Sequence, residues 1–359
     1  MESVEIGARM HNRLEARSFD NLSQSSEGRS VWERLFTRSE DKTVFLLAGW
    51  LDAWHQTLGQ NKPLKVVTVY QNSKPVLAGA FSKRENSIVF AGRGPSDYAQ
   101  FLIDRDFVES DQLSQAVDLL LSEVRKQLQG GRWFRFGRIP MNSRTFKLLT
   151  NSNSKYRGIP TTKTVAPHMT MDLATSAVKK KSLKRHENKL RRRGELFKTT
   201  YTEYSHVEPL LDDFFDQHQR RWRIAGTSSQ FEDETQRGFV ALSCKALASE
   251  GALRFTVVRS LQDVVAYHFG FCHSGVFTWY KPSFDPNFAE YSPGEVLLKT
   301  LIETAIAEDA SIFDFTIGNE AFKHRFANHY PEVSYINASE KHHLRLLFRL
   351  RNLLRNSKP

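Results

Sequence analysis

Hydrophobic positions in the first half of the chain alternate between a helical and a strand period. Trp50, Leu51 and Trp54 share one face of a helix predicted over residues 47–58. A longer apolar stripe predicts a helix over residues 112–129, which Gly130-Gly131 should end. The other elements predicted here are helices over residues 31–38 and 143–149 and strands over residues 64–70, 75–82, 87–91 and 132–137.

The second half repeats this alternation, without a sequence repeat strong enough to prove duplication. Its predicted strands cover residues 166–172, 196–203, 253–259, 263–273, 276–282 and 311–317, and its predicted helices cover residues 207–224, 232–250 and 294–309. Helices that alternate with runs of consecutive strands in each half predict an α+β (mixed α/β) fold.

The 359 residues are enough for two domains, and 40% hydrophobic with 25% charged residues is typical of globular proteins. Residues 1–29 are polar and aperiodic, so we expect them to be loosely ordered. The pattern breaks near Pro160, which predicts a first domain over residues 30–160, a second over 161–340 and a separate tail over 341–359.

Positive charge is concentrated in two segments of a chain whose formal net charge is +11. Residues 179–193 hold nine Lys or Arg and one acid, Glu187, and residues 341–359 hold six Lys or Arg and no acid. The rest of the chain is therefore slightly acidic. The first segment predicts a helix that is solvated and structural, faces an anionic glycan or lipid-linked substrate, or binds nucleic acid; no nucleic-acid reading module supports the last. The leucines and arginines of the tail predict an amphipathic helix that packs on the protein or rests on an anionic membrane.

Cysteine usage and the amino terminus bear on compartment and metal content. Cys244 and Cys272 cannot form a disulfide framework and have no metal-ligand spacing, so we expect no metal. The first 20 residues lack the apolar run of a secretory signal, and the longest apolar stretch, about residues 43–51, is too short to span a membrane. A cytoplasmic protein is the expectation, and the tail leaves peripheral contact with a membrane open.

A Ser292-Pro293-Gly294 turn precedes the helix predicted over residues 294–309. The first N–H groups of a helix and its dipole make an anion site suited to phosphates. The same residues would serve a plain helix start, with Ser292 as the capping residue and Pro293 in the first turn.

A second polar cluster follows, in which Asp314 sits inside an apolar strand and Asn319, Glu320 and Lys323 come directly after it. A carboxylate among phenylalanines must find a partner or shift its pKa. Asp314 could therefore be catalytic, cap a loop or pair with an arginine. Glu320 and Lys323 have the spacing of a simple ion pair.

Taken together, these segments resemble the CelD-like branch of the GNAT acyltransferase superfamily. The resemblance covers residues 30–330 and is carried by TVFLLAGWLDAWHQTLG, GRGPSDYAQFLI, SLKRHENKLRRRGEL, HQRRW, VAYHFGF, YSPGEVLL and FDFTIGNEAFKHRF. It implies two tandem GNAT-like domains, each with a mostly antiparallel sheet flanked by helices, as in Fem-type peptidyl transferases. It also implies that the pyrophosphate of acyl-CoA lies on the turn formed by Ser292, Pro293, Gly294, Glu295, Val296 and Leu297. The usual glycine pattern is reduced to Gly294, and the charge of Glu295 would oppose phosphate.

GNAT chemistry is direct acyl transfer, which requires orientation, oxyanion stabilisation and a proton path. The resemblance favours Lys323 as the electrostatic stabiliser, because Phe322-Lys323 resembles the aromatic-Lys pair at the same place in Fem-type enzymes. Asp314, Glu320 and, less favoured, His268 are the candidate bases. Tyr280 could protonate the leaving thiolate, although a strand tyrosine is more often a core residue.

Substrate contacts are expected from five residues in these motifs, namely Asp97, Tyr98, Trp222, His268 and Asn319. Asp97 and Tyr98 follow a Gly-rich loop that could bind an acceptor in a cleft between domains. An Asx-turn that only holds the loop is the alternative.

The resulting expectation is an acyltransferase that moves an acyl group from acyl-CoA to an amine, or to a hydroxyl, in cell-envelope or exopolysaccharide synthesis. One alternative is a Fem-type peptidyl transferase that uses aminoacyl-tRNA. Another is a non-catalytic GNAT-like binding or scaffold protein of a polysaccharide system.

Overall fold

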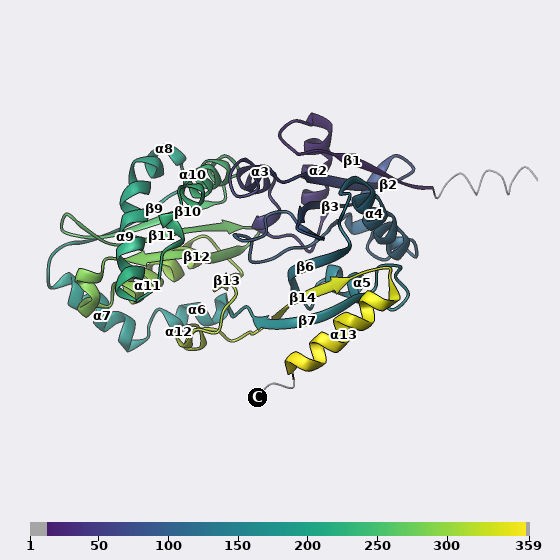
Figure 1. Cartoon of the computed structure of the whole chain (residues 1–359). Coiled ribbons are helices and arrows are strands. Elements are labelled where there is room, and N and C mark those ends of the chain that lie inside the picture. Colours follow the sequence, from purple (N-terminus) through teal and green to yellow (C-terminus); the bar gives the residue numbers. More distant parts are fainter. Residues whose placement is uncertain (1–12, 357–359) are drawn as a thin grey trace, which may run out of the picture. The chain divides into compact units, whose positions relative to one another are not determined.

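The computed structural model describes residues 13–356, which divide into two compact units. The first unit comprises the chain up to Thr164 and again from Glu332, and the second comprises Val165–Pro331 (Figure 1). The chain passes from the first unit to the second between Thr164 and Val165, near the boundary predicted at residue 160. The second domain nevertheless ends before the expected residue 340, because the segment after Pro331 returns to pair with a strand of the first unit.

The first unit is built on one sheet with the strand order β1-β2-β3-β4-β6-β14-β7, and β5 pairs with β3. Its strands are β1 (Leu14–Phe19), β2 (Leu64–Gln71), β3 (Lys74–Arg84), β4 (Ser87–Phe90), β5 (Leu102–Ile103), β6 (Trp133–Pro140), β7 (Gly158–Val165) and β14 (Glu332–Ala338). β4 and β6 run parallel, whereas β6 and β14 are antiparallel.

β1 corrects the expectation that residues 1–29 are loosely ordered, because it pairs with β2 over its whole length. Most of its side chains are only partly buried, so its sequence LEARSF lacks a clear apolar alternation. α2 also begins within this segment, at Ser26. The expectation for residues 1–12 lies outside the described residues.

Helices cover the sheet of the first unit and complete its core. They are α2 (Ser26–Arg38), α3 (Ala48–Gln56), α4 (Leu113–Gln127), α5 (Arg144–Thr150) and α13 (His342–Asn356), with short 3-10 turns at Val44–Leu46 and Arg105–Phe107. The predicted stripe of α4 packs on the strands in a core that includes Phe81, Phe90, Phe134 and Phe136.

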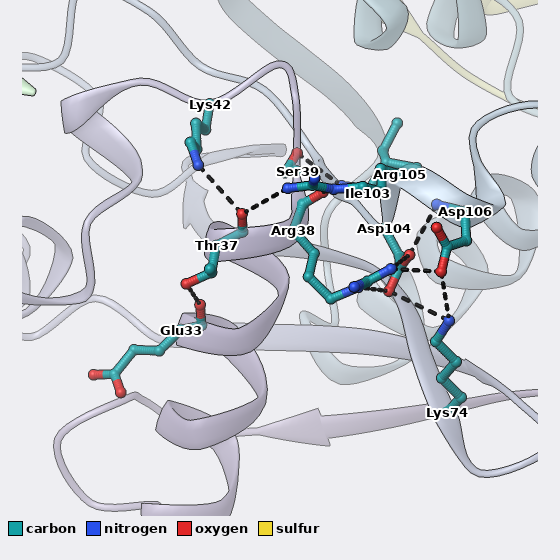
Figure 2. Close-up of polar contacts among 10 residues, drawn as sticks. All are labelled: Glu33, Thr37, Arg38, Ser39, Lys42, Lys74, Ile103, Asp104, Arg105 and Asp106. Carbon is teal, nitrogen blue, oxygen red and sulfur yellow. Dashed lines mark hydrogen bonds and ion pairs between the residues drawn. The ribbon is translucent and has the colours of Figure 1, made fainter. Parts of the chain in front are cut away.

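A buried ion pair ties the end of α2 to the segment after β5 (Figure 2). Asp104 is fully buried and accepts bonds from Arg38 Nε at 2.7 Å and Nη2 at 3.0 Å. Burial would raise the pKa of Asp104, but the bond from Arg38, the N–H of Asp106 and the charge of Lys74 lower it below its usual value. These charges therefore serve to fix the fold.

The tail forms the predicted helix, α13, and part of it packs on the first unit. Phe348 is buried, with its ring 6.3 Å from that of Trp133, and Asn352 donates a hydrogen bond to the carbonyl of Pro160. Other large side chains on this helix, including those of Leu350 and Leu353, are exposed. α13 thus has both a packed and an exposed apolar face.

The second unit is built on a six-stranded sheet in the order β8-β13-β12-β11-β10-β9. Its strands are β8 (His168–Thr170), β9 (Leu196–Tyr201), β10 (Leu253–Ser260), β11 (Asp263–His273), β12 (Val276–Phe284) and β13 (Ile312–Asp314). Only β12 and β13 pair in parallel within this sheet. The two helix-flanked, mostly antiparallel sheets confirm the predicted α+β (mixed α/β) fold class.

The helices of the second unit are α6 (Met171–Ala177), α7 (Lys181–Arg191), α8 (Tyr204–Val207), α9 (Leu211–Ile224), α10 (Glu234–Ser249), α11 (Pro293–Ala307) and α12 (Ala321–His324). Short 3-10 helices lie at Glu208–Leu210, Gln230–Glu232 and Pro286–Tyr291. Within residues 13–356, every helix is too short or too polar to cross a bilayer.

α7 is the helix predicted from the basic segment, and one face of it is buried. Leu183 and Leu190 are fully buried, and Glu187 lies between them. Glu187 accepts from Lys198 Nζ at 2.7 Å and lies 2.8 Å from Lys299 Nζ of α11. Burial would raise the pKa of Glu187, but the bonds from Lys198 and Lys299 overcome it and hold the pKa at about 2. The single acid of the segment therefore anchors the helix.

Candidate functional site

A pocket of the second unit lies where two parallel strands separate. β12 pairs with β13 only from Val276 to Thr278, and β12 then continues to Phe284 without β13 beside it. A pocket of about 320 Å³ lies along this part of β12 and reaches the first turn of α11. Its lining comes from β12, from the turn and start of α11, from α12 and from Arg221 of α9. The side chains of Trp279, Phe284, Phe322 and Phe326 make much of it apolar.

The predicted turn lies at one end of this pocket, where Ser292, Pro293, Gly294, Glu295 and Leu297 line it. Val296 does not line the pocket, because its side chain is fully buried in the core. Of the six residues expected to hold a pyrophosphate, five therefore reach the cavity.

The start of α11 differs from a plain capped helix. Ser292 adopts a left-handed conformation with φ 53°, and its side chain makes no capping bond. Its carbonyl accepts the N–H groups of Glu295 and Val296, whereas the N–H of Gly294 has no partner among the described residues. The alternative in which the Ser292 side chain caps the helix is therefore wrong, and the Gly294 N–H is available to a ligand.

Two arginines that the sequence did not single out line the pocket. Arg325 Nη1 lies 2.6 Å from Glu295 Oε1, so the charge of Glu295 is offset rather than directed alone at the cavity. The Arg221 guanidinium lies 4.5 Å from the Phe284 ring and donates to the carbonyl of Pro282. Burial lowers the pKa of Arg221 from its usual value. Arg221 lies on α9 and Arg325 directly follows α12, about 100 positions later in the sequence, so no local motif brings them together.

Lys323 and Glu320 lie together beside the pocket without lining it. Lys323 is buried, its Nζ donates to the carbonyl of Ile317 at 3.0 Å, and it lies 2.9 Å from Glu320 Oε2. Gly318 has φ 136°, and a Cβ there would meet Glu320 Oε2 at 2.3 Å. The loop therefore wraps around the ammonium group, and Phe322, the neighbour of Lys323, faces the cavity.

Asp314 has the buried position that the sequence predicts. Its Oδ1 accepts the N–H of Thr316 at 2.7 Å and lies 3.2 Å from His168 Nε2 of β8. His168 was not identified from the sequence, because its segment carries no motif and reaches β13 only through sheet pairing. Asp314 is thus placed at the end of β13, where the two parallel strands separate.

His268 and Tyr280 have positions that differ from their expected roles. His268 is fully buried, and its Nε2 accepts the N–H of Tyr280 at 3.1 Å. Since a backbone N–H only donates, His268 carries its proton on Nδ1. Burial lowers the pKa of His268 to about 3, so it is neutral at pH 7. The Tyr280 side chain is also buried, with its ring 5.1 Å from that of Phe271. His268 is therefore no substrate contact in this geometry. Tyr280 lies in the core, and its role as proton donor to the thiolate stays a prediction.

Trp222 and Asn319 lie outside the pocket lining. Trp222 is partly exposed on α9, and its indole N–H donates to His218 Nε2 at 3.0 Å. Burial, together with the charges of Lys281 and Arg221, lowers the pKa of His218 to about 3. Asn319 is exposed and lies 2.6 Å, through Oδ1, from His324 Nε2. The structure does not bring these two residues to the cavity.

Asp97 and Tyr98 belong to the first unit and are both buried. Asp97 Oδ1 accepts from Arg138 Nη1 at 2.9 Å. The Tyr98 ring lies 5.8 Å from the ring of Phe45. In this structure the two residues hold the loop that they follow. Among the described residues, no group of His, Cys, Asp and Glu is arranged to hold a metal ion.

Comparisons with known proteins bear on the second unit and on the whole fold. Residues 177–324 match the model of the acetyltransferase (GNAT) domain family. No protein of curated function matches the chain. Among solved structures, FemX is similar over 89% of this chain and 96% of its own, with a TM-score of 0.61 and 8% identity.

Two further solved structures are similar over most of both chains. The C-terminal domain of a putative lysylphosphatidylglycerol synthetase from Agrobacterium fabrum covers 91% of this chain and 97% of its own, with a TM-score of 0.56 and 12% identity. L-PGS from Bacillus licheniformis is similar over 90% of this chain and 95% of its own, with a TM-score of 0.55 and 13% identity. At such identities the likeness shows the fold alone. The chain therefore contains a GNAT-fold domain over residues 177–324, within an architecture that FemX shares.

Proposed function

We propose that the second unit binds acyl-CoA in the pocket beside β12 and transfers the acyl group to an amine, with a hydroxyl as the second choice of acceptor. One observation carries this proposal. The cavity is lined by β12 beyond the end of its pairing with β13, by Gly294, whose N–H has no partner among the described residues, and by the guanidinium of Arg325. An N–H and a guanidinium suit a pyrophosphate. Beyond Thr278, β13 no longer lies beside β12, and this edge of the strand suits the amides of an extended pantetheine chain.

The chemistry requires little beyond placement of the reactants. The acceptor amine attacks the thioester carbon. A C–N bond forms while the C–S bond breaks, and CoA leaves as a thiolate. The amine proton passes to a base, for which Asp314 and Glu320 are the candidates. Lys323, held by the loop beside Phe322, would stabilise the developing negative charge.

The biological setting follows from the resemblance to the CelD-like branch, which points to cell-envelope or exopolysaccharide synthesis. The exposed leucines of α13 and the arginines between them suit peripheral contact with an anionic membrane from the cytoplasm. Vesicle co-sedimentation of the intact chain is the direct measurement of this contact.

Acyl-CoA should stabilise the protein against heat. A ligand at 100 times its Kd stabilises by about 2.7 kcal/mol, so a panel of acyl-CoAs should raise the Tm in a thermal-shift experiment. Arg325→Gln should weaken binding about fivefold, which corresponds to about 1 kcal/mol for one charge-assisted bond. Glu295→Gln should strengthen it, because Arg325 is then no longer paired. If no acyl-CoA shifts the Tm of the wild-type protein, acyl-CoA is not the donor.

The second candidate is a Fem-type transferase that takes its acyl group from aminoacyl-tRNA. The exposed Lys and Arg side chains of α7 favour it, because they present a dense positive surface to a polyanion. Charged tRNA would then bind with an affinity that falls steeply with salt, and acyl-CoA would not bind. A non-catalytic scaffold, the third alternative, would bind a ligand of either kind without turnover.

Replacing Lys323 or Asp314 should lower turnover by at least tenfold in a transfer assay, a loss of about 1.4 kcal/mol of transition-state stabilisation or more. Lys323→Ala removes the charge, and Asp314→Asn removes a candidate base while keeping its size. Acyl-CoA affinity should change little, since neither residue lines the pocket. Unchanged turnover in both variants would refute the site assignment even where acyl-CoA binds.

A further inference from the structure

A cavity of about 240 Å³ in the first unit has a lining rich in arginine. Arg84 ends β3, Arg93 lies in the loop after β4, and Arg135 and Arg138 lie on β6. Because these residues come from three separate segments, counting charge along the sequence does not reveal their cluster.

Of these four arginines, only Arg138 forms an ion pair with an acidic side chain in the described part of the chain. Arg138 Nη1 donates to Asp97 Oδ1 at 2.9 Å and to the carbonyl of Ser96 at 2.6 Å. Arg84, Arg93 and Arg135 form no ion pair with any residue in the described part of the chain. Asp97 therefore offsets one of four positive charges, and three remain at the cavity.

The arginines are close enough to repel one another. Burial lowers the pKa of Arg93 from its usual value, and the charges of Arg135, Arg84 and Arg138 lower it further. Like charges that converge on a cavity cost free energy unless an anion joins them. This cost is a reason to expect an anionic ligand, because Asp97 is the one acidic partner of the cluster in the described part of the chain.

The walls of the cavity are held by bonds that leave these three guanidinium groups free. Trp54 Nε1 donates to the backbone carbonyl of Arg93 at 3.3 Å. A Cβ on Gly137 would lie 2.7 Å from the Tyr335 ring, so only glycine lets that ring lie close against β6. A Cβ on Gly94 would meet nothing within 4 Å, which leaves the loop side of the cavity open.

We propose that this arginine pocket binds the phosphate or diphosphate group of a small ligand. Guanidinium groups bind phosphate oxygens in bidentate fashion and remain charged when partly buried. The cavity of about 240 Å³ has room for such a group. The site lies in a different unit from the proposed donor pocket, so its test does not depend on acyl transfer. If the proposed function also holds, a phosphorylated acceptor is the natural occupant.

The test is calorimetric titration of the intact protein with inorganic phosphate, inorganic pyrophosphate and glucose 1-phosphate. Arg93→Gln and Arg135→Gln should each weaken binding of the tightest probe at least tenfold. Arg34→Gln, an exposed arginine of the same unit, should leave binding unchanged. Tighter binding of glucose 1-phosphate than of the inorganic anions would identify a sugar phosphate as the ligand class, and the reverse order would identify the free anion.

Arg325→Gln serves as the control for binding in the other unit. Loss of anion binding in Arg325→Gln with full binding in Arg93→Gln would assign the anion to the donor pocket and overturn the proposal. Equal weakening in Arg34→Gln and Arg93→Gln would show attraction by net charge alone, and would overturn it as well. Arg84→Gln, which like Arg135 is at an exposed position, repeats the test where the half-buried Arg93→Gln variant fails to fold.

Discussion

Replacing Gly270 by alanine is expected to destabilise the second unit by about 4 kcal/mol, from overpacking together with loss of a buried hydrogen bond. A Cβ at this position would lie 1.9 Å from His268 Cε1 and 2.6 Å from the carbonyl oxygen of Thr278. The His268 ring cannot simply move aside, because it is fully buried and its Nε2 accepts the N–H of Tyr280. Chemical unfolding followed by circular dichroism measures the effect.

Gly294→Ala is the matched control, because the nearest atom to a Cβ there is 3.6 Å away, on Phe284. Its stability should change by less than about 1 kcal/mol, as expected for ordinary van der Waals contact. A small effect in both variants would mean that the irregular pairing opposite Gly270 adapts freely. The register shift between β11 and β12 would then accommodate the added methyl group without strain.

The sequence predicted most of the second unit because its strands and helices have long, regular apolar patterns. β10, β11 and β12 lie close to their predicted ranges, and so does α11. β1 was missed because an edge strand that is half buried needs no apolar alternation. The return of β14 to the first sheet was missed because a pairing of β14 with β6 joins residues almost 200 positions apart.

The candidate site also contains residues that a local sequence motif reveals and residues that only the fold brings together. The turn at Ser292 was found because one short motif holds most of its contacts, and five of its six residues reach the pocket. Arg221, Trp279 and Arg325 were missed as lining residues because only the fold brings them together. The burial of His268 could not be predicted, since apolar residues flank it on both sides and give no sign of which face is the core.

Replacing Glu187 by glutamine should lower stability by about 3 kcal/mol at pH 7, a value typical of breaking a buried ion pair and consistent with a pKa held at about 2. The Glu187 side chain is only 10% exposed, and Lys198 and Lys299 would each lose a carboxylate partner. Lys299 lies on α11, the helix whose first turn lines the proposed donor pocket. Denaturant unfolding at several pH values measures the difference from wild type.

The pH dependence separates a lost charge from a change in packing. The folded pKa of Glu187 lies below its ordinary value of 4.5, so its contribution is fully present above pH 4.5 and is lost as pH falls through about 2. The gap between wild type and Glu187→Gln should close over that window. Glu290→Gln is the control, because its pair with Lys189 is exposed and should contribute less than about 1 kcal/mol. A gap that persists at pH 2 would show that glutamine disturbs the packing of α7 on α11, and that the ion pairs are not what anchors the basic helix.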